Sequence, residues 1–341
     1  MIRAGASGLV RCLAAAVLFG ASAPAASKLA GSSNAVLLAG VLYLGASLAV
    51  LPLSRRRPPT VAMARAGGAS LALAVVLGGA VAPVLLMNGL ARTPAATASL
   101  LLNLELVATV ALAAVVFREH LGRAVIGGTA CVVAAGVVLV WSAAPQMRAG
   151  ALFVAGACLC WGVDNTVTAK LDAVPPHLVT LAKGIVAGTA NLVIGLAAGQ
   201  SLPWTHVAAA LVIGAVGYGA SITIWITGAR DLGAARAQLV FATAPFFGVA
   251  VAWIALGDPV LRAQVVAIAI ASTGVALVLK SDHTHGHQHY AIEHAHGHDH
   301  ADPHHRHDHM EAVARHDGVH RHDAVRHDHP HVPDVHHRHD H

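Results

Sequence analysis

The sequence predicts an all-α integral membrane protein with a polar, disordered C-terminal tail, and three observations lead to this prediction. Of the 341 residues, 56% are hydrophobic and only 11% are charged, whereas a soluble domain carries about 25% charged residues. The apolar residues of 1–280 fall into runs of about 20, which is long enough for a helix to cross a bilayer. Finally, 22 of the 25 histidines lie in residues 281–341. This composition excludes an ordinary soluble enzyme.

Ten transmembrane helices are expected in residues 1–280. Helices are required because a bilayer offers no hydrogen-bond partner to free backbone groups. The expected spans are 9–30, 34–53, 68–91, 95–117, 123–142, 149–170, 177–199, 204–228, 233–256 and 260–280. The five tryptophans mostly lie near the span ends, as residues that anchor helices at the membrane surface do: Trp141, Trp161, Trp204, Trp225 and Trp253. The cysteines inside the spans are expected to be small packing residues rather than disulfide partners: Cys12, Cys131, Cys158 and Cys160.

The basic residues indicate how these helices are oriented. Residues 1–280 hold 17 Lys and Arg against 6 Asp and Glu, whereas residues 281–341 hold 5 Arg against 11 acidic residues. If the N-terminus is cytoplasmic, most of the basic residues fall on the cytoplasmic side. The exceptions are Arg92, Arg148 and Arg262. We therefore expect an inner (plasma) membrane protein with both termini in the cytoplasm.

The apolar part of the chain repeats itself. Gly20 and Lys28 recur 142 residues later as Gly162 and Lys170. Other pairs recur at similar offsets, namely Glu119 with Asp258 and Arg92 with Arg230. Two halves of five helices are therefore predicted, 1–145 and 146–280, followed by the tail at 281–341. Because each half has an odd number of spans, the halves have opposite orientations, as in the inverted repeats of secondary transporters.

The repeat also bears on the first helix. A cleaved signal peptide ending near residues 21–25 is the alternative reading of the N-terminal segment. Because the first helix has a counterpart in the sixth span, we expect it to be retained in the mature protein.

The chain resembles the EamA-type branch of the drug/metabolite transporter superfamily over about residues 1–280. The resemblance is carried by ATASLLLNLELVATVALAAVVFREHLGRAVIGGTACVVAAGVVLV at 96–140 and its counterpart ARAQLVFATAPFFGVAVAWIALGDPVLRAQVVAIAIASTGVALVL at 235–279. It implies ten helices in an inverted five-plus-five repeat, cytoplasmic termini and transport of small solutes, with no particular substrate. The chain departs from the family pattern at Leu106, where many members have a proline, as the second half does at Pro245. Glu105 and the polar segment 161–165 are further departures.

Polar side chains inside the spans mark the candidate site. A charge at the bilayer centre costs about 2.5–3.5 kcal/mol on insertion scales, so such residues usually have a role. We expect a central cavity in which a buried carboxylate carries a proton in exchange for substrate. Its predicted lining is Glu105, Asn103, Asp164, Asn165 and Lys183, with Asn88, Lys28 and Lys170 as further candidates.

A purely structural reading of the same residues stays open. Glu105 or Asp164 could pair with Lys183 or an amide and only lock helices together. Lys28 and Lys170 lie near span ends, where long side chains can snorkel to the interface. Glu119 and Asp258 are expected to act as caps or loop anchors.

The tail is rich in His-x-His motifs and poor in large apolar residues, so it is expected to be disordered. Imidazole with nearby Asp suits Zn²⁺, Ni²⁺, Co²⁺ or Cu²⁺. The predicted ligands are His283, His285, His287, His289, His294, His296, His298, His300, His304, His305, His307 and His309. A metal buffer or sensor, a funnel for a transported metal, a pH-sensitive segment with His pKa values near about 6.5, and a solvated tail with incidental affinity are the alternatives.

These observations predict a secondary active transporter of small organic solutes that works by alternating access, with proton exchange at Glu105 or Asp164. No GxxxxGK[ST] motif occurs, so an ATP-driven pump is disfavoured. The alternatives are a divalent-metal permease and a membrane-tethered metal buffer or sensor. We expect no enzymatic activity, no required cofactor and no nucleic-acid partner. The expected partners are the lipid bilayer, a small-molecule substrate and divalent metal ions, and a homodimer stays open.

Overall fold

A computed structural model describes two compact units of the chain. The described residues are 2–31, 34–56, 58, 61–117, 122–168, 171, 174–232, 240–279, 283–289, 292–299, 315–322 and 325–331. One unit comprises residues 1–281 together with 335–341, and the other comprises residues 282–334. We call them the membrane unit and the tail unit and describe each by itself.

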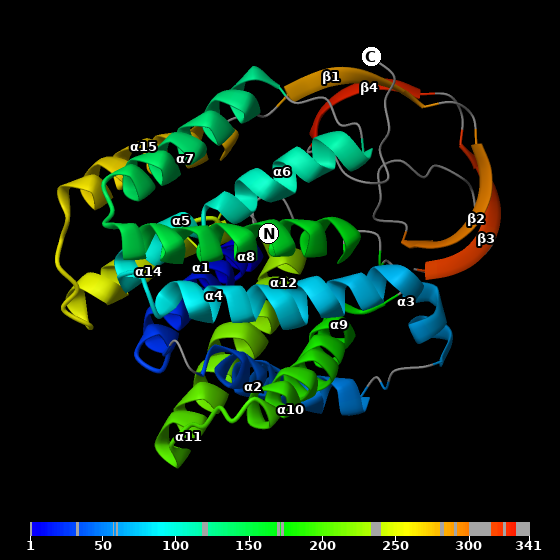
Figure 1. The fold of residues 1–341 in the computed structure, drawn as a ribbon. Helices are drawn as coiled ribbons and strands as arrows, with labels where there is room; N and C mark the ends of the chain where they lie inside the picture. Colours follow the sequence, from blue (N-terminus) through cyan, green and yellow to red (C-terminus); the bar gives the residue numbers. More distant parts are fainter. Residues whose placement is uncertain are drawn as a thin grey trace. The chain divides into compact units, whose positions relative to one another are not determined.

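The membrane unit is built from helices (Figure 1). Its first part contains α1 (Ile2–Ser27), α2 (Ala35–Arg56), α3 (Val61–Leu73), η1 (Ala74–Val81), α4 (Ala82–Leu90), α5 (Ala95–Leu101), α6 (Leu104–Phe117) and α7 (Arg123–Trp141). Its second part contains α8 (Pro145–Thr168), α9 (Pro176–Ala182), η2 (Lys183–Ala187), α10 (Gly188–Ala197), α11 (Trp204–Ile213), η3 (Gly214–Ala220), α12 (Ser221–Leu232), α14 (Ala244–Ile254) and α15 (Arg262–Leu279). The η segments are π-helical turns within longer helices.

Eight helical stretches among the described residues are long and apolar enough to cross a membrane. They are Ser7–Ser27, Ala35–Arg56, Gly67–Leu90, Ala95–Leu112, Arg123–Trp141, Met147–Thr168, Pro176–Ala197 and Trp204–Gly228. These stretches confirm the first eight predicted spans. The ninth and tenth predicted spans coincide with two shorter apolar helices, Ala244–Ile254 and Arg262–Leu277. The predicted total of ten spans is therefore not confirmed by length.

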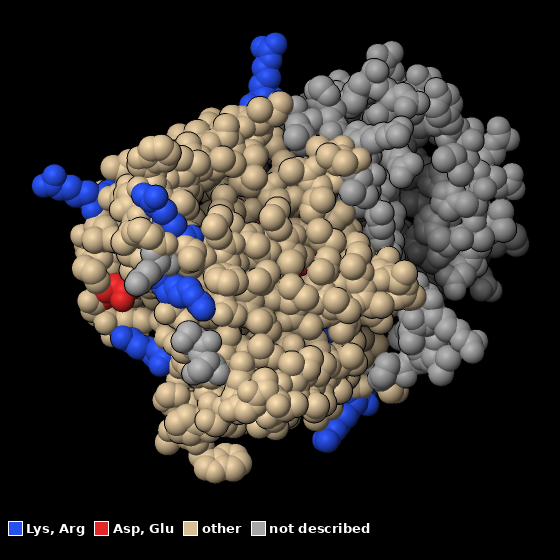
Figure 2. Space-filling view, viewed as in Figure 1, with Lys and Arg blue, Asp and Glu red and all other residues tan. Residues whose placement is uncertain are grey.

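Large apolar side chains cover the outside of the helices. Val115, Ile254 and Leu152 are 76%, 86% and 69% exposed, respectively. The face shown in Figure 2 carries few charged side chains. Such a surface is unfavourable in water and favourable against lipid tails, so the chain is a multi-pass membrane protein.

Two irregularities recur at the same offset in the two parts of the membrane unit. The π-helical segments η1 and η3 begin 140 residues apart. The fourth span breaks at residues 102–103 between α5 and α6, and the helix leading into α14 breaks at residues 242–243. Because α6 begins at Leu104 and α14 at Ala244, Leu106 and Pro245 both lie in the first turn after these breaks.

Helices at this offset also pack against one another. The neighbouring pairs are α2 with α10 and α7 with α15, and the second pair is visible in Figure 1. A Cβ atom at Gly40 would lie 2.5 Å from the backbone nitrogen of Leu192, and one at Gly274 would lie 2.6 Å from the carbonyl oxygen of Gly128. Glycine therefore lets each pair of backbones approach closely. Contacts between corresponding helices are expected near the axis of an inverted repeat.

The tail unit contains four β-strands among its described residues. They are β1 (His283–His289), β2 (Ile292–Asp299), β3 (Arg315–His322) and β4 (Val325–His331). Strand β1 pairs antiparallel with β4, and β2 pairs antiparallel with β3 (Figure 1). The prediction of a disordered tail is therefore not confirmed. Backbone pairing accounts for the strands without a hydrophobic core, because antiparallel ladders satisfy N–H and C=O groups directly.

Candidate functional site

An ion pair inside the membrane unit joins the sixth and seventh spans. The Lys183 ammonium, at the start of η2, donates to Asp164 Oδ2 over 2.6 Å. The two side chains are only 16% and 6% exposed. Thr168 Oγ1 donates to the other carboxylate oxygen of Asp164 over 3.1 Å. Both charges are thus held in a region of low polarity, where removing either partner would be costly.

A second polar pair involves Asn165, the residue of α8 that follows Asp164. Asn165 Nδ2 donates to Glu105 Oε1 over 2.9 Å and to Thr109 Oγ1 over 3.3 Å. Glu105 is in the first turn of α6, directly after the break at residues 102–103. Among the described residues, Glu105 has a neutral amide as its partner, whereas Asp164 has a cation. We call Glu105, Asp164, Asn165 and Lys183 the charged cluster.

The π-helical segment η1 forms one wall of the charged cluster. A Cβ atom at Gly78 would lie 2.1 Å from Asp164 Oδ2, so only glycine fits beside this carboxylate. The Gly78 carbonyl has no donor within its own helix, because the Ala82 N–H bonds to Leu77 and residue 83 is a proline. Tyr43 and Trp161 supply the missing bonds: Tyr43 Oη donates to the Gly78 oxygen over 2.7 Å and Trp161 Nε1 over 3.1 Å.

The break in the fourth span is stabilised by a side chain. Asn103 is 5% exposed, and its Nδ2 donates to the Leu100 carbonyl over 3.1 Å. The corresponding break before α14 is stabilised by a similar side-chain hydrogen bond, in which Thr243 Oγ1 donates to the Val240 carbonyl over 2.6 Å. Discontinuous helices of this kind place backbone groups next to the binding sites of transporters. Asn103 therefore shapes the site, and no bond joins its side chain to the charged cluster among the described residues.

An aromatic cluster lies beside the charged one. Phe19 of α1 packs edge-on against Tyr218 of η3, with ring centroids 5.9 Å apart, and lies 5.2 Å from Phe241. Trp225 continues the cluster at 6.0 Å from Phe241, and Tyr43 lies 5.9 Å from Tyr218. Because the Tyr43 hydroxyl also bonds to Gly78, this residue connects the aromatic cluster with the charged cluster.

A separate polar network lies at the end of the membrane unit where α8 begins. Asp258 Oδ2 accepts a bond from the Ala96 N–H over 3.1 Å, and Gln264 Nε2 donates to Thr97 Oγ1 over 2.9 Å. Thr93 Oγ1 places this end beside the first turn of α8 by donating to the Met147 carbonyl over 3.3 Å. Asp258 thus anchors a loop, as predicted. Met147 and Asp164 are separated by about 25 Å of helix.

The remaining predicted site residues lie elsewhere. Asn88 pairs with Arg92, whose Nη1 donates to Asn88 Oδ1 over 3.0 Å, and Arg92 in turn lies over the ring of Phe153. Lys28 is exposed in the turn after α1. Lys170 and Glu119 lie outside the described residues. Neither Asn88 nor Lys28 bonds to the charged cluster among the described residues, so the geometry gathers four of the eight candidates.

Tyr43, Gly78 and Trp161 belong to the site although the sequence pattern did not predict this. Trp161 was expected to anchor a span end, but it is 8% exposed and bonds to the Gly78 carbonyl inside the membrane unit. Trp141 and Trp204, at 82% and 86% exposed, fit the anchor role better. The sequence signal for these contacts is Pro83, a few residues after Gly78 and Gly79. Because proline has no N–H, a carbonyl in the preceding turn lacks its helical donor and needs another one.

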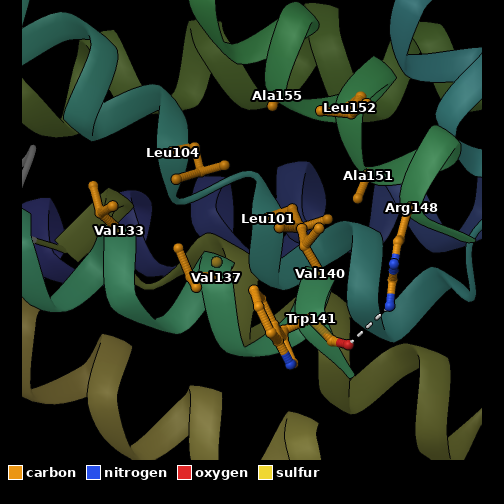
Figure 3. A pocket seen from close by; sticks show the side chains of 11 residues that line it. Leu101, Leu104, Val133, Val137, Val140, Trp141, Arg148, Ala151, Leu152 and Ala155 are labelled. Carbon is orange, nitrogen blue, oxygen red and sulfur yellow. Dashed lines mark hydrogen bonds between the residues drawn. The ribbon is translucent and has the colours of Figure 1, made fainter. Parts of the chain in front are cut away.

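One pocket of about 360 Å³ lies away from the charged cluster (Figure 3). Arg148 is its one charged lining residue, and Arg148 Nη2 donates to the Trp141 carbonyl over 3.4 Å. Side chains at the rim, such as Leu152 and Val137, are exposed on the apolar surface. The pocket therefore suits a hydrocarbon chain better than a polar solute. It is lined by Leu101, Leu104, Val133, Gly136, Val137, Val140, Trp141, Arg148, Ala151, Leu152 and Ala155.

The described residues of the membrane unit contain no group of three or more His, Cys, Asp or Glu side chains placed to hold a metal ion. No disulfide joins the four cysteines, and Cys12 and Cys158 are buried. Of the predicted histidine ligands, the structure describes the backbone of those in β1 and β2. His300, His304, His305, His307 and His309 lie outside the described residues.

Apolar helices with a polar cluster, π-helical turns and a broken span define a multi-pass membrane protein of the transporter class. The model of the EamA-like transporter family matches residues 6–142 and, a second time, residues 148–280, so the chain belongs to this family. Members of the family are transporters rather than enzymes.

Two further proteins are similar to this chain. A protein of Methanothermobacter thermautotrophicus named as an uncharacterized transporter is 25% identical over 294 residues, covering 80% of this chain and 85% of its own length. A solved protein crystal structure is similar in fold, with a TM-score of 0.56 and 20% sequence identity. The match covers 80% of this chain and 96% of that chain.

Proposed function

We propose that the protein is a secondary active transporter of small organic solutes, and that its two halves, 1–145 and 146–280, alternate access to the charged cluster. The observation that carries the proposal is the pair of adjacent residues on α8, Asp164 and Asn165. Each holds a partner from another span, Lys183 and Glu105 respectively. Family membership and the broken fourth span support it.

The two clusters suit a solute with a polar group and an apolar portion. In the absence of solute, Asp164 and Lys183 neutralise one another. A solute with both a cationic and an anionic group can separate the two side chains and leave each charge paired. The aromatic cluster next to Tyr43 offers flat apolar surfaces for the rest of the solute.

Proton exchange is assigned to Glu105 rather than Asp164. Asp164 forms an ion pair with the Lys183 ammonium at 2.6 Å, so proton uptake by its carboxylate would break that pair. Glu105 contacts only neutral donors among the described residues, so it can take up and release a proton without breaking an ion pair. Its position directly after the helix break places it where movement of α6 would change its surroundings.

Alternating access requires one end of the site to be closed while the other opens. We assign the closed end to the network of Asp258, Gln264 and Thr97, which ties the loop before α15 to the start of α5. Because these elements come from different halves, relative rotation of the halves would break the bonds between them.

The distribution of basic residues supports a proposed membrane and orientation for the transporter. We place it in the inner membrane with both termini cytoplasmic, because Arg92, Arg148 and Arg262 are the exceptions to a basic cytoplasmic side. The bonds of Thr93 to Met147 and of Asp258 to Ala96 support the placement of all three arginines at the same end of the membrane unit. We assign the protein no catalytic activity and no required cofactor, and a homodimer is an assembly to be tested.

A transport assay tests the proposal. Purified protein is first screened against a library of small solutes by thermal shift, and uptake of each stabilising solute is then measured in proteoliposomes with an imposed pH gradient. Glu105→Gln is expected to abolish the response of uptake to the gradient while solute binding remains. Glu293→Gln, the same substitution in the tail, serves as the matched control. Gradient-driven uptake that survives in Glu105→Gln would remove Glu105 as the proton carrier.

The tail supports a second proposed function, binding of divalent transition metals at the membrane. Its 22 histidines in 61 residues are the observation that favours it. Transport of the metal itself is less well supported, because the described part of the membrane unit offers no metal-holding group.

A further inference from the structure

We propose that the tail binds a divalent transition-metal ion across strands β1 and β4, through histidines that stand opposite one another in the antiparallel register. This proposal rests on the proposed metal binding of the tail and assigns it to particular residues. The register forms three consecutive histidine pairs, which we call the histidine ladder: His283 with His331, His285 with His329, and His287 with His327.

The spacing of the ladder follows from strand geometry. Residues at alternate positions of a strand share one face, so His283, His285 and His287 lie on the same face of the sheet. Their partners are also at alternate positions of β4 and lie on that face as well. Directly opposite Cα atoms in an antiparallel pair are about 4.5–5.5 Å apart. Successive pairs along the strands are separated by about 7 Å.

This arrangement supplies the ligands that a transition metal requires. Zn²⁺ in closed sites takes four ligands in a tetrahedral arrangement, and neutral imidazole is one of its preferred donors. Two neighbouring pairs of the ladder provide four imidazoles, two from each strand. Strand pairing holds these histidines together before the metal arrives, which reduces the entropy lost on binding.

The second sheet of the tail provides an internal comparison. In β2 and β3, His294 stands opposite His320 and His298 opposite His316, but His296 between them faces Gly318. No two consecutive histidine pairs therefore occur in this sheet, so among the described strands two neighbouring His–His pairs are found only in the β1–β4 ladder. The tightest site of the tail is accordingly assigned to β1 and β4.

The His-x-His spacing predicts ligands between residues 283 and 309. The register changes this assignment, because the partners of the first three histidines come from residues 327–331. His289 stands opposite Val325 and is outside the ladder. Sequence spacing alone did not bring these segments together, because they are separated by more than thirty residues of chain.

The proposal is tested by titrating the full-length protein in detergent with Zn²⁺ alone, in competition with a chromophoric chelator. The protein carries no polyhistidine tag, since a tag would add imidazoles. Two variants each remove one side of the ladder: H283Q/H285Q/H287Q and H327Q/H329Q/H331Q. A matched control, H304Q/H305Q/H307Q, removes the same number of histidines from another part of the tail.

Each ladder variant is expected to weaken the tightest Zn²⁺ site by about 100-fold, because the remaining strand loses the chelate advantage of its partner. Combining the two ladder variants is expected to cause no further loss at that site, and the control variant is expected to retain it. X-ray absorption of the protein loaded with one equivalent of Zn²⁺ should report four imidazole nitrogens. Unchanged thermal unfolding of the membrane unit shows that each variant has folded.

Two results would overturn the proposal in different ways. Absence of Zn²⁺ binding to the unmodified protein at micromolar concentrations would overturn both metal binding by the tail and the ladder. Equal loss of affinity in the two ladder variants and the control would leave metal binding by the tail in place and overturn the ladder alone, because affinity would then depend on the number of histidines and not on the register.

Discussion

Corresponding positions in the two parts of the membrane unit carry different chemistry on a similar scaffold. At one of two corresponding contacts between the parts, Asp164 of α8 packs against Gly78 of η1, and at the other, Ser22 of α1 packs against Gly217 of η3. Glu105 follows one helix break, and Pro245 follows the other. The backbone irregularities are thus shared, whereas the charged side chains occur at one location and the aromatic rings lie beside the other.

This difference distinguishes the backbone features that belong to the fold from the side chains that belong to the site. The π-helical turns and helix breaks occur in both parts, so they follow from the fold that the family shares. Charges at membrane depth are costly, and the chain carries them at only one of the two corresponding positions. We therefore expect substitutions in the charged cluster to change transport, and substitutions of the shared scaffold to affect both parts alike.

The largest expected effect comes from breaking the ion pair. Asp164→Leu leaves the Lys183 ammonium unpaired, and removal of one partner of a buried pair typically costs about 3–5 kcal/mol. Ser22→Ala at the corresponding position removes the bonds of this hydroxyl with the Phe19 carbonyl and with Tyr218, and is expected to cost about 2 kcal/mol. Equilibrium unfolding of both variants, followed by tryptophan fluorescence, measures the difference. Equal losses would contradict the distinction between the two positions.

A smaller loss of stability is expected from substitutions of the glycines in the π-helical segments that both parts share. Gly78→Ala places a methyl group against the Asp164 carboxylate, and Gly217→Ala places one 2.4 Å from Ser22 Cβ. Each is expected to lower the free energy of unfolding by about 1–3 kcal/mol through overpacking. Gly127→Ala on α7 is the matched control, because nothing lies within 4 Å of its added Cβ. If Gly78→Ala were as stable as Gly127→Ala, the close packing of η1 on α8 would be disproved.

The sequence was sufficient to predict the class of fold and most of the spans. Hydropathy and the recurrence of Gly20 and Lys28 as Gly162 and Lys170 carried that prediction. Glu105, Asp164, Asn165 and Lys183 stood out because charge at membrane depth is expensive.

Which of these residues pair with one another could not be read from the sequence. Pairing depends on rotation of the helices about their axes and on π-helical turns, which shift the residues that follow them. The role of Trp161 was missed for this reason, because its partner is a carbonyl freed by Pro83 in another span. The strands of the tail were missed because pairing of distant segments leaves no local signal.

The smallest expected effect lies in the aromatic cluster. Phe19→Leu removes ring contacts with Tyr218 and Phe241, worth about 0.5–1.5 kcal/mol beyond the buried area. We expect it to raise the KM for an apolar solute and to leave the response of uptake to the pH gradient unchanged. Phe153→Leu, which alters an aromatic ring beside Arg92, is the comparison variant. A changed pH response in Phe19→Leu would show that the two clusters do not have separate roles.

Uptake by the double variant Asp164→Leu/Lys183→Met tests whether this ion pair belongs to the transport site. Replacing a buried ion pair by apolar residues is often neutral for stability, so the double variant should unfold like the unmodified protein. If the pair binds the solute, proteoliposomes containing this stable variant will show no uptake. Unimpaired uptake by the double variant would show that Asp164 and Lys183 only hold helices together, and would contradict their place in the transport site.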